Sequence, residues 1–270
     1  MPRHLPGSFF LRNLIEGRSL LFQLVRRDFR QRFVGSAGGW LWSIIHPLVL
    51  LLSWTFVFSI CLQVKLPENA LTRSYPLFLF AGMLPWLLFS ETVQRSATSL
   101  LEHANLITKT VFPAEVVPVS VFLSSVVSHL MAVALVVIAV VVGLQHLSWT
   151  LLFLPVYIGL LGLFAIGIGW IAASLQVYLR DTTQVFAVLL TFWFWMTPIF
   201  ITEEQFPARL RFLIRGNPLA YVVRAYREML LSRWTPHWRE LAVVCAYAAV
   251  TFIAGGLFFR HMKRGFADVL

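Results

Sequence analysis

Long apolar runs without charge constrain this chain more than any other feature. No Asp, Glu, Lys or Arg occurs in residues 33–64, 116–179, 182–202 or 241–259. A run of about 18 or more such residues is long enough to cross a membrane as a helix. The run 116–179 has room for two crossings, with a turn at Gly-Leu-Gln-His, residues 143–146. Only 13% of the residues are charged, against about 25% in soluble proteins. The chain is therefore predicted to be one integral membrane unit.

The pattern predicts an all-α membrane protein with six transmembrane helices. The second has the weakest pattern, because its uncharged part covers only residues 74–90 and Glu91 and Arg95 follow. These two side chains are four residues apart, so they share a helix face and are expected to pair or to face protein rather than lipid. The six helices are expected at about residues 37–61, 75–99, 116–142, 150–178, 183–201 and 240–260.

Basic residues predict the orientation of the chain. Residues 1–36 contain seven arginines, and the end of the chain carries Lys263 and Arg264. Basic segments favour the cytoplasmic side, so both ends are expected there, which requires an even number of crossings. The predicted organisation is a cytoplasmic interface helix at 1–36, a six-helix transmembrane domain at 37–260 and a cytoplasmic tail at 261–270.

The first segment has the spacing of an amphipathic helix. In residues 9–33 the apolar side chains can share one face, and the arginines fall largely elsewhere. We interpret the segment as a helix lying in the headgroup plane; the alternative is an amphipathic helix packed on a partner. The glycine-rich run 35–39 then lets the backbone turn into the membrane. Trp40 and Trp42 follow, where interfacial aromatic rings are favoured.

Residues 203–239 break the charge rule, because they should lie on the far side yet contain seven arginines. Their apolar stretches 210–214 and 219–223 are too short to cross, and three prolines interrupt them. We interpret the segment as short re-entrant helices, which are tolerated where protein or an aqueous cavity covers the backbone. The alternative is an ordinary outer loop.

The chain carries no motif for nucleotide binding or hydrolysis. It has no Gly-x-x-x-x-Gly-Lys-Ser/Thr loop, no Gly-x-Ser-x-Gly elbow and no His-Glu-x-x-His. The acidic residues do not form the intramembrane series of a proton-coupled carrier. The net charge of +10 is expected to meet anionic lipid headgroups rather than nucleic acid. Cys61 and Cys245 are expected to be buried thiols, with a disulfide as the alternative, and His46 is expected to be a packed or weakly hydrogen-bonded side chain rather than a ligand. If this chain moves a substrate across the membrane, the energy must come from elsewhere.

Several segments carry a resemblance to a known family. They are residues 24–59, residues 75–119, Tyr-Leu-Arg-Asp at 178–181, Thr-Pro-Ile at 197–199, Asn-Pro-Leu at 217–219 and Arg224. In this order they resemble the type-2 ABC permeases that export polysaccharides, and among these the O-antigen and teichoic-acid exporters most, with capsule exporters further off.

The resemblance implies a permease chain without catalytic residues, a metal site or a cofactor of its own. It implies a homodimer in the bacterial inner membrane, with two copies of a separate ABC ATPase that use ATP and Mg. The cargo would be a lipid-linked glycan, with O-antigen favoured; membrane lipids are the other partners. Two alternatives stay open: an exporter of a small lipid, lipo-oligosaccharide or drug, and a membrane enzyme acting on lipid-linked sugars.

The resemblance also implies roles for particular residues. The first and fifth helices would line the pathway, with lipid-facing packing as the alternative for each aromatic ring. The arginines would attract the carrier diphosphate, with lipid anchoring as the alternative. A cytoplasmic loop and turn would contact the ATPase; the Arg-Asp pair alternatively contacts another partner or caps the next helix. The candidates are, for the pathway, Trp40, Trp42, Trp54, Phe192, Trp193, Phe194 and Trp195; for the diphosphate or headgroup, Arg26, Arg27, Arg30 and Arg32; for ATPase coupling, Glu102, Asn105, Lys109, Phe112, Pro113, Arg180 and Asp181; and for the gate, Asn217, Pro218, Tyr221 and Arg224.

Overall fold

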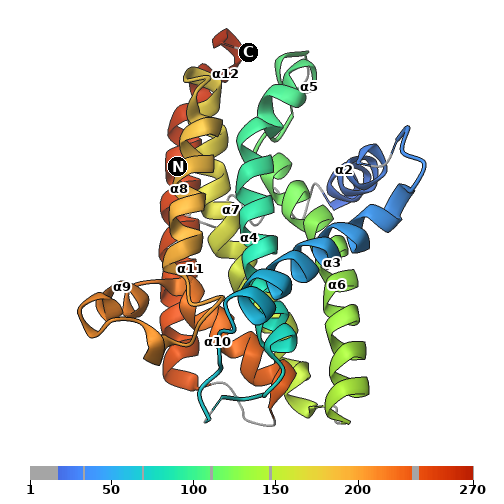
Figure 1. Ribbon diagram of the computed structural model, residues 1–270. Helices are drawn as coiled ribbons and strands as arrows, with labels where there is room; N and C mark the ends of the chain where they lie inside the picture. Colours follow the sequence, from blue (N-terminus) through green and yellow to red (C-terminus); the bar gives the residue numbers. More distant parts are fainter. Residues whose placement is uncertain are drawn as a thin grey trace.

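The computed structural model describes residues 18–32, 34–68, 70–109, 112–145, 148–232 and 237–269 (Figure 1). Every regular element in this part of the chain is helical, which confirms the predicted all-α class. In chain order the elements are α2 (Arg18–Gln31), η1 (Gly39–Leu41), α3 (Trp42–Thr55), η2 (Phe56–Cys61), α4 (Tyr75–Glu102), α5 (Ala104–Lys109), α6 (Val116–Leu144), η3 (Trp149–Phe153), α7 (Leu154–Tyr178), α8 (Thr182–Met196), η4 (Glu203–Gln205), η5 (Ala208–Leu210), α9 (Arg211–Arg215), α10 (Pro218–Leu231), α11 (Trp238–Met262), η6 (Lys263–Gly265) and α12 (Phe266–Val269).

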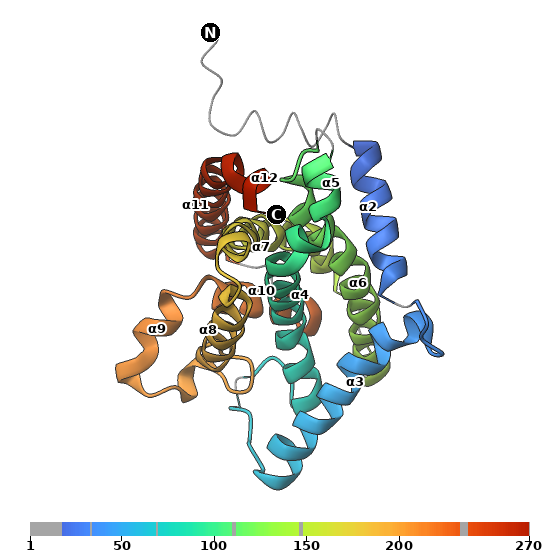
Figure 2. The ribbon, with the colours of Figure 1, turned by 90° about the horizontal axis from the view of Figure 1, so that it is seen from above.

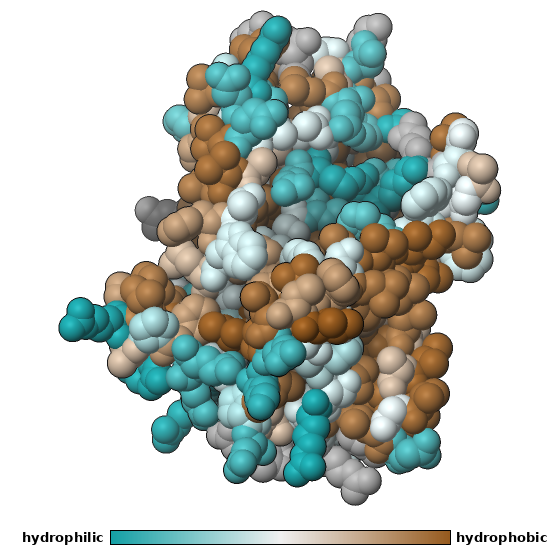
Figure 3. All heavy atoms as spheres, viewed as in Figure 1, coloured by the Kyte–Doolittle hydropathy of each residue, from teal (hydrophilic) through white to brown (hydrophobic). Residues whose placement is uncertain are grey.

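Among the described residues, five helical segments are long and apolar enough to cross a membrane. They are Gly39–Cys61, Tyr75–Glu102, Val116–Leu144, Trp149–Tyr178 and Trp238–Gly265. They correspond to the first, second, third, fourth and sixth predicted helices. In Figure 3 hydrophobic atoms dominate the middle of the molecule, and hydrophilic atoms gather toward its two ends, as expected for a chain embedded in lipid.

The predicted fifth helix is shorter than expected. It is α8, which has 15 residues and so rises about 22 Å, less than the roughly 30 Å hydrocarbon core. The helix ends at Met196 because Pro198 disfavours helical geometry in the residue before it, and Thr197 has φ −92° and ψ 134°. The prediction that this helix reaches residue 201 is therefore wrong at its C-terminal end.

α4 lies in the centre of the bundle, packed against α6, α7 and α10 (Figure 2). In its most apolar stretch 78% of the residues are buried, whereas none is buried in the corresponding stretch of Gly39–Cys61. A helix enclosed by protein does not have to be uniformly apolar, because it meets little lipid. This explains why the second predicted helix has the weakest hydropathy pattern.

α2 lies beside α6, and the chain then turns toward α3 (Figure 2). The turn uses Gly35 at φ +77° and Gly39 at φ +49°, a region that favours glycine, as the sequence predicted. On α2, Leu24 is buried against the bundle while Phe22 is exposed. The helix therefore packs on its own chain and still presents an apolar side chain outward. The earlier part of the predicted helix, residues 9–17, lies outside the described residues.

The segment after α8 contains two short helices, α9 and α10. α10 is almost wholly buried and packs against α4, so protein covers its backbone. This agrees with the interpretation of the segment as two short helices rather than an irregular loop. Its depth in the membrane stays a prediction, and residues 233–236 lie outside the described residues.

α7 and α11 approach each other closely at two glycines. A Cβ at Gly255 would lie 2.1 Å from the carbonyl oxygen of Gly167, and a Cβ at Gly167 would lie 2.4 Å from that of Thr251. Helices in lipid associate through close packing rather than the hydrophobic effect, so small residues matter at such contacts.

Gly167→Ala is expected to destabilise the protein by about 1–3 kcal/mol, because the added methyl group overpacks the contact with α11. The measurement is the melting temperature of the purified protein in detergent. Gly159→Ala on the same helix is the control, because a Cβ there meets no atom within 4 Å. Equal melting temperatures for the two variants would contradict the packing argument.

Candidate functional site

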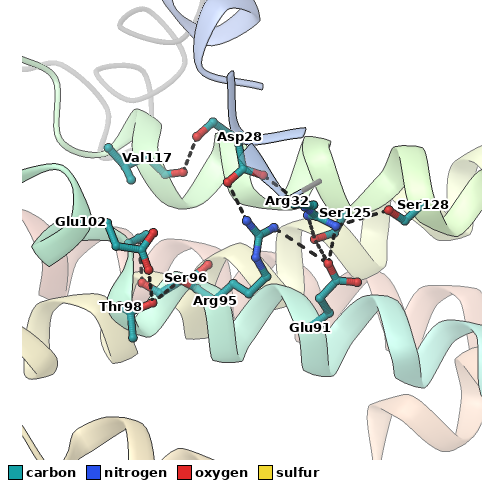
Figure 4. A network of polar contacts seen from close by, with 12 residues as sticks. Asp28, Arg32, Glu91, Arg95, Ser96, Thr98, Glu102, Val117, Ser125 and Ser128 are labelled. Atoms are coloured by element: carbon teal, nitrogen blue, oxygen red, sulfur yellow. Dashed lines mark hydrogen bonds and ion pairs between the residues drawn. The ribbon is translucent and has the colours of Figure 1, made fainter. Parts of the chain in front are cut away.

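Four charged side chains join α2 to α4 (Figure 4). Arg32 lies 2.6 Å from Glu91 (Nη1–Oε1) and 3.4 Å from Asp28 (Nε–Oδ2). Arg95 lies 2.5 Å from Asp28 (Nη2–Oδ1) and 3.8 Å from Glu91 (Nη1–Oε1). The predicted Glu91–Arg95 pair is therefore confirmed, but the shorter contacts of both side chains run to α2. We call Asp28, Arg32, Glu91 and Arg95 the α2–α4 network.

Two serines of α6 complete this arrangement. Arg32 donates from Nη2 to the hydroxyl of Ser125 at 3.0 Å and from Nη1 to that of Ser128 at 3.3 Å. The Ser125 hydroxyl in turn donates to Glu91 at 3.1 Å. The α2–α4 network is thus balanced in charge and hydrogen-bonded on three helices, which is what makes charges tolerable in an apolar bundle.

The carboxyl group of Asp28 is ionised at neutral pH. Burial by itself raises its pKa, but the nearby Ser124 hydroxyl and the guanidinium groups of Arg95 and Arg32 bring the pKa below its ordinary value. Because the pKa of Asp28 is lowered in the folded state, its ionised carboxylate stabilises the docked α2 at pH values above the ordinary pKa of an aspartate. This contribution is lost as the pH falls through the lowered pKa.

A polar hollow of about 390 Å³ adjoins the α2–α4 network between α3, α4 and α6. In Figure 3 a hydrophilic patch lies in this region, beside α2 and above α3. His46 is exposed on its wall, so the prediction of a packed side chain is wrong. His129, also in the lining, is buried and lies 3.1 Å (Nε2) from the Tyr226 hydroxyl on α10. His129 thus links the lining of the hollow to α10.

The arginines of α2 divide into two groups. Arg26, Arg27 and Arg30 are exposed, whereas the Arg32 side chain is only 14% exposed and its guanidinium is held by the α2–α4 network. The three exposed residues are free to meet an anionic headgroup; Arg32 holds the helix that presents them.

An aromatic cavity of about 220 Å³ lies between α3, α4 and α8. Trp54, Trp86 and Phe194 line it, with ring centroids 5.0 Å apart for Trp54–Phe194 and 5.2 Å apart for Trp86–Phe194. Ser90 and Gln94 of α4 line both this cavity and the polar hollow. The two cavities therefore follow one another along the same face of α4.

The other aromatic candidates take different positions. Trp40, Trp42, Phe192 and Trp195 are exposed. Trp193 instead points into the bundle, where its ring packs on Phe89 and Phe164 and its Nε1 donates to Asn217 at 2.9 Å. Phe192 and Trp195 thus lie on the outer face of α8, and Trp193 and Phe194 face the bundle.

The gate candidates are tied together at the end of the bundle opposite the C-terminus (Figure 1). Asn217 caps α10 by accepting from the Leu219 amide, and Pro218 occupies the first turn. The Tyr221 hydroxyl donates to the carbonyl of Arg215 at 2.7 Å. Arg224 forms ion pairs with Glu203 and Glu240.

The coupling candidates lie around α5 and the α7–α8 turn. Glu102, Asn105, Arg180 and Asp181 are exposed, and Phe112 and Pro113 are half-buried. Asp181 is at the N-cap of α8, but its side chain makes no capping hydrogen bond, so the capping alternative is not observed. The side chain of Lys109 lies outside the described residues.

Sequence reasoning missed three well-placed charged residues. Glu115 is 1% exposed, and Lys263 Nζ lies 2.6 Å from its Oε2, which fastens the tail to the start of α6. Arg227 is buried against the bundle. Asp28 belongs to the α2–α4 network. Only Asp28 left a signal, as an acidic residue within an arginine run.

Cys61 and Cys245 are free and exposed, so the expected burial is wrong.

A family model described as ABC-2 type transporter matches residues 19–231. The chain belongs to the ABC-2 type transporter family. The match spans α2 to α10, and so includes the α2–α4 network, both cavities and all four gate candidates.

Relatives of this ABC-2 transporter align along nearly its whole length. An O-antigen export system permease protein RfbA of Myxococcus xanthus is 26% identical, over 96% of this chain and 98% of its own. The protein of the same name from Klebsiella pneumoniae is 28% identical, over 93% and 95%. The polysialic acid transport protein KpsM of Escherichia coli is 24% identical, over 89% and 92%.

Asp28→Asn is expected to weaken the docking of α2 by about 1.5–3 kcal/mol, because Arg95 and Arg32 lose a charged acceptor in a largely buried setting. Hydrogen–deuterium exchange of the α2 amides in the purified protein is expected to become faster. Asp181→Asn, at an exposed position, is the control and should leave α2 unchanged. Unaltered exchange in Asp28→Asn would contradict a structural role for the network.

Proposed function

We propose that this chain is the permease subunit of an ATP-driven exporter that moves a lipid-linked polysaccharide, of the O-antigen type, out of the cytoplasm. The near full-length similarity to permeases named for O-antigen export supports this cargo. Membership of a transporter family argues against the alternative of a membrane enzyme.

The observation that carries the proposal is the exposure of the first and fifth helices. The most apolar stretch of Gly39–Cys61 has no buried residue, whereas 22–78% of the residues are buried in the corresponding stretches of the other four candidate spans. α8 also turns large rings outward, with Phe192 67% and Trp195 58% exposed. Surfaces of this kind suit a second copy of the chain, with a conduit between the copies. We therefore propose a homodimer whose pathway runs beside α3 and α8.

The cargo would enter at the α2 end of the bundle. Exposed Arg26, Arg27 and Arg30 can attract the diphosphate of the lipid carrier, because guanidinium groups bind phosphate oxygens in a bidentate way. The polar hollow behind α3 would keep the first sugars hydrated at the depth of the inner leaflet. The exposed arginines of α2 and the polar hollow together favour a cargo with an anionic headgroup followed by a hydrophilic chain.

The aromatic cavity would guide the glycan onward. Sugar rings stack their C–H faces on aromatic rings, and such contacts are individually weak, so a polymer can slide over them. Trp54 of α3, Trp86 of α4 and Phe194 of α8 form this lining in the single chain. Further aromatic rings are exposed nearby in sequence: Trp40 on η1, Trp42 on α3, and Phe192 and Trp195 on α8.

The driving force would come from a separate ABC ATPase docked at the end that carries α5 and the α7–α8 turn. α12 packs on both α5 and α7, and the Tyr178 hydroxyl donates to the carbonyl of Met262 at 2.9 Å. A push on α5 or on Arg180 and Asp181 would therefore reach the transmembrane helices directly. ATP and Mg would be used by that subunit. Both chain ends would then be cytoplasmic, in a bacterial inner membrane.

Arg26→Gln combined with Arg27→Gln is expected to lower export about two- to tenfold, because the diphosphate loses two charge-assisted contacts. The measurement is surface polysaccharide in a gene-deletion strain that expresses the variant. In the deletion strain itself, the polysaccharide should be absent from the surface and lipid-linked precursor should accumulate inside.

Arg209→Gln combined with Arg215→Gln is the matched control, since both side chains are exposed at the other end of the bundle. It should export like the unaltered chain if the effect depends on the position of the charge. Normal surface polysaccharide in the deletion strain would refute the proposed function.

A further inference from the structure

A cavity of about 420 Å³ lies beside α10, on the side of the bundle away from the α2–α4 network. This volume falls within the range of small-molecule sites, about 300–1,000 Å³. Its walls come from α10, from the segment after α8 and from the segment before α4. Neither the pathway nor the ion pairs described above account for it.

Glu228 lines this cavity, and one of its carboxylate oxygens is buried without a hydrogen-bond partner among the described residues. The residue is 6% exposed, and its Oε2 has no hydrogen-bond partner in the part of the chain that the structure describes. Its Oε1 lies 3.8 Å from Nδ1 of His237. A buried carboxylate oxygen without a partner is costly, and a ligand that donates a hydrogen bond removes the cost.

Arg227 contributes unused donors from the adjacent position. Its guanidinium donates to the carbonyls of Phe78, Pro198 and Ile199 at 3.2, 2.8 and 2.5 Å. It also lies 3.6 Å above the Phe78 ring. A guanidinium has five N–H donors, so about two stay available. Gly82 makes room for this group, since a Cβ there would lie 2.5 Å from Nη2.

The charge of the lining restricts the ligand. Glu203, Glu204 and Glu228 supply three carboxylates, and Arg224 and Arg227 supply two guanidinium groups. A ligand that both donates and accepts hydrogen bonds matches these walls, and sugar hydroxyls do both. A ligand rich in carboxylates would meet a net negative lining.

We propose that this cavity, lined by Arg227 and Glu228, is a saccharide-binding site for neutral or amino sugars of the emerging glycan. The proposal rests on the proposed function, because it takes the cargo to be a polysaccharide that leaves at the α10 end. The site holds one sugar unit after it has passed the aromatic cavity. It thereby opposes backward sliding of the chain between strokes of the ATPase.

Glu228→Gln tests the site in binding and in export. The binding probe is the oligosaccharide released by mild acid from the cells' own surface polysaccharide, titrated by saturation-transfer NMR onto the full chain in phosphatidylcholine nanodiscs. Loss of a hydrogen bond to a charged group is expected to weaken binding about tenfold. Export in the complemented deletion strain is expected to fall several-fold at equal amounts of membrane protein.

Glu68→Gln is the matched control, because this exposed glutamate lies outside the cavity. Leu71→Trp is the second variant; it fills the cavity from the preceding loop and removes binding without touching either charged residue. A tetramer of sialic acid should bind more weakly than the neutral or amino-sugar probe.

Two results would overturn the site. They are unchanged oligosaccharide binding in both Glu228→Gln and Leu71→Trp, and tighter binding of the sialic acid tetramer than of the neutral or amino-sugar probe. If the deletion strain retains its polysaccharide, the proposed function fails instead. The two failures are therefore distinguishable.

Discussion

The ion pairs between α2 and α4 determine where the interface helix and the neighbouring cavities of this transporter lie. α4 ends in charged residues, and an apolar bundle tolerates them only when partners neutralise them. Asp28 on α2 lies 2.5 Å from Arg95, and Arg32, directly after α2, lies 2.6 Å from Glu91. The ion pairs place α2 beside α6 and hold the start of α3 above a polar hollow. The exposed arginines, the hollow and the aromatic cavity all take their positions from this contact.

Burial then separates helices that form the scaffold from helices that face a partner. α4 is enclosed, and α7 and α11 lock together through Gly167 and Gly255. The segment Gly39–Cys61 and α8 stay on the outside, although they carry large aromatic rings. A rigid core with two exposed aromatic helices fits the conduit between two copies that we propose. At the far end, α10 is held by the ion pairs of Arg224.

Apolar periodicity predicted most of the fold, because helix length in lipid is set by hydrophobic thickness. It failed at the end of α8, where the local effect of Pro198 outweighs the apolar character of residues 199–201. The pairing of Glu91 with Arg95 was predictable from their spacing. Their closer partners on α2, the inward turn of Trp193 and the buried Glu228 were not, since each depends on which helix packs against which face. The structure therefore keeps Arg32 and Trp193 in structural roles and adds Arg227 and Glu228.

The central claim is a conduit whose movement of cargo depends on an ATPase docked at its α5 end. Its most direct test is transport of fluorescent lipid-linked glycan into proteoliposomes that contain the purified chain, with and without its partner ABC ATPase. The account predicts transport only when chain, ATPase and ATP with Mg are all present, and none when the ATPase is omitted. Transport by the chain alone at the full rate would contradict it.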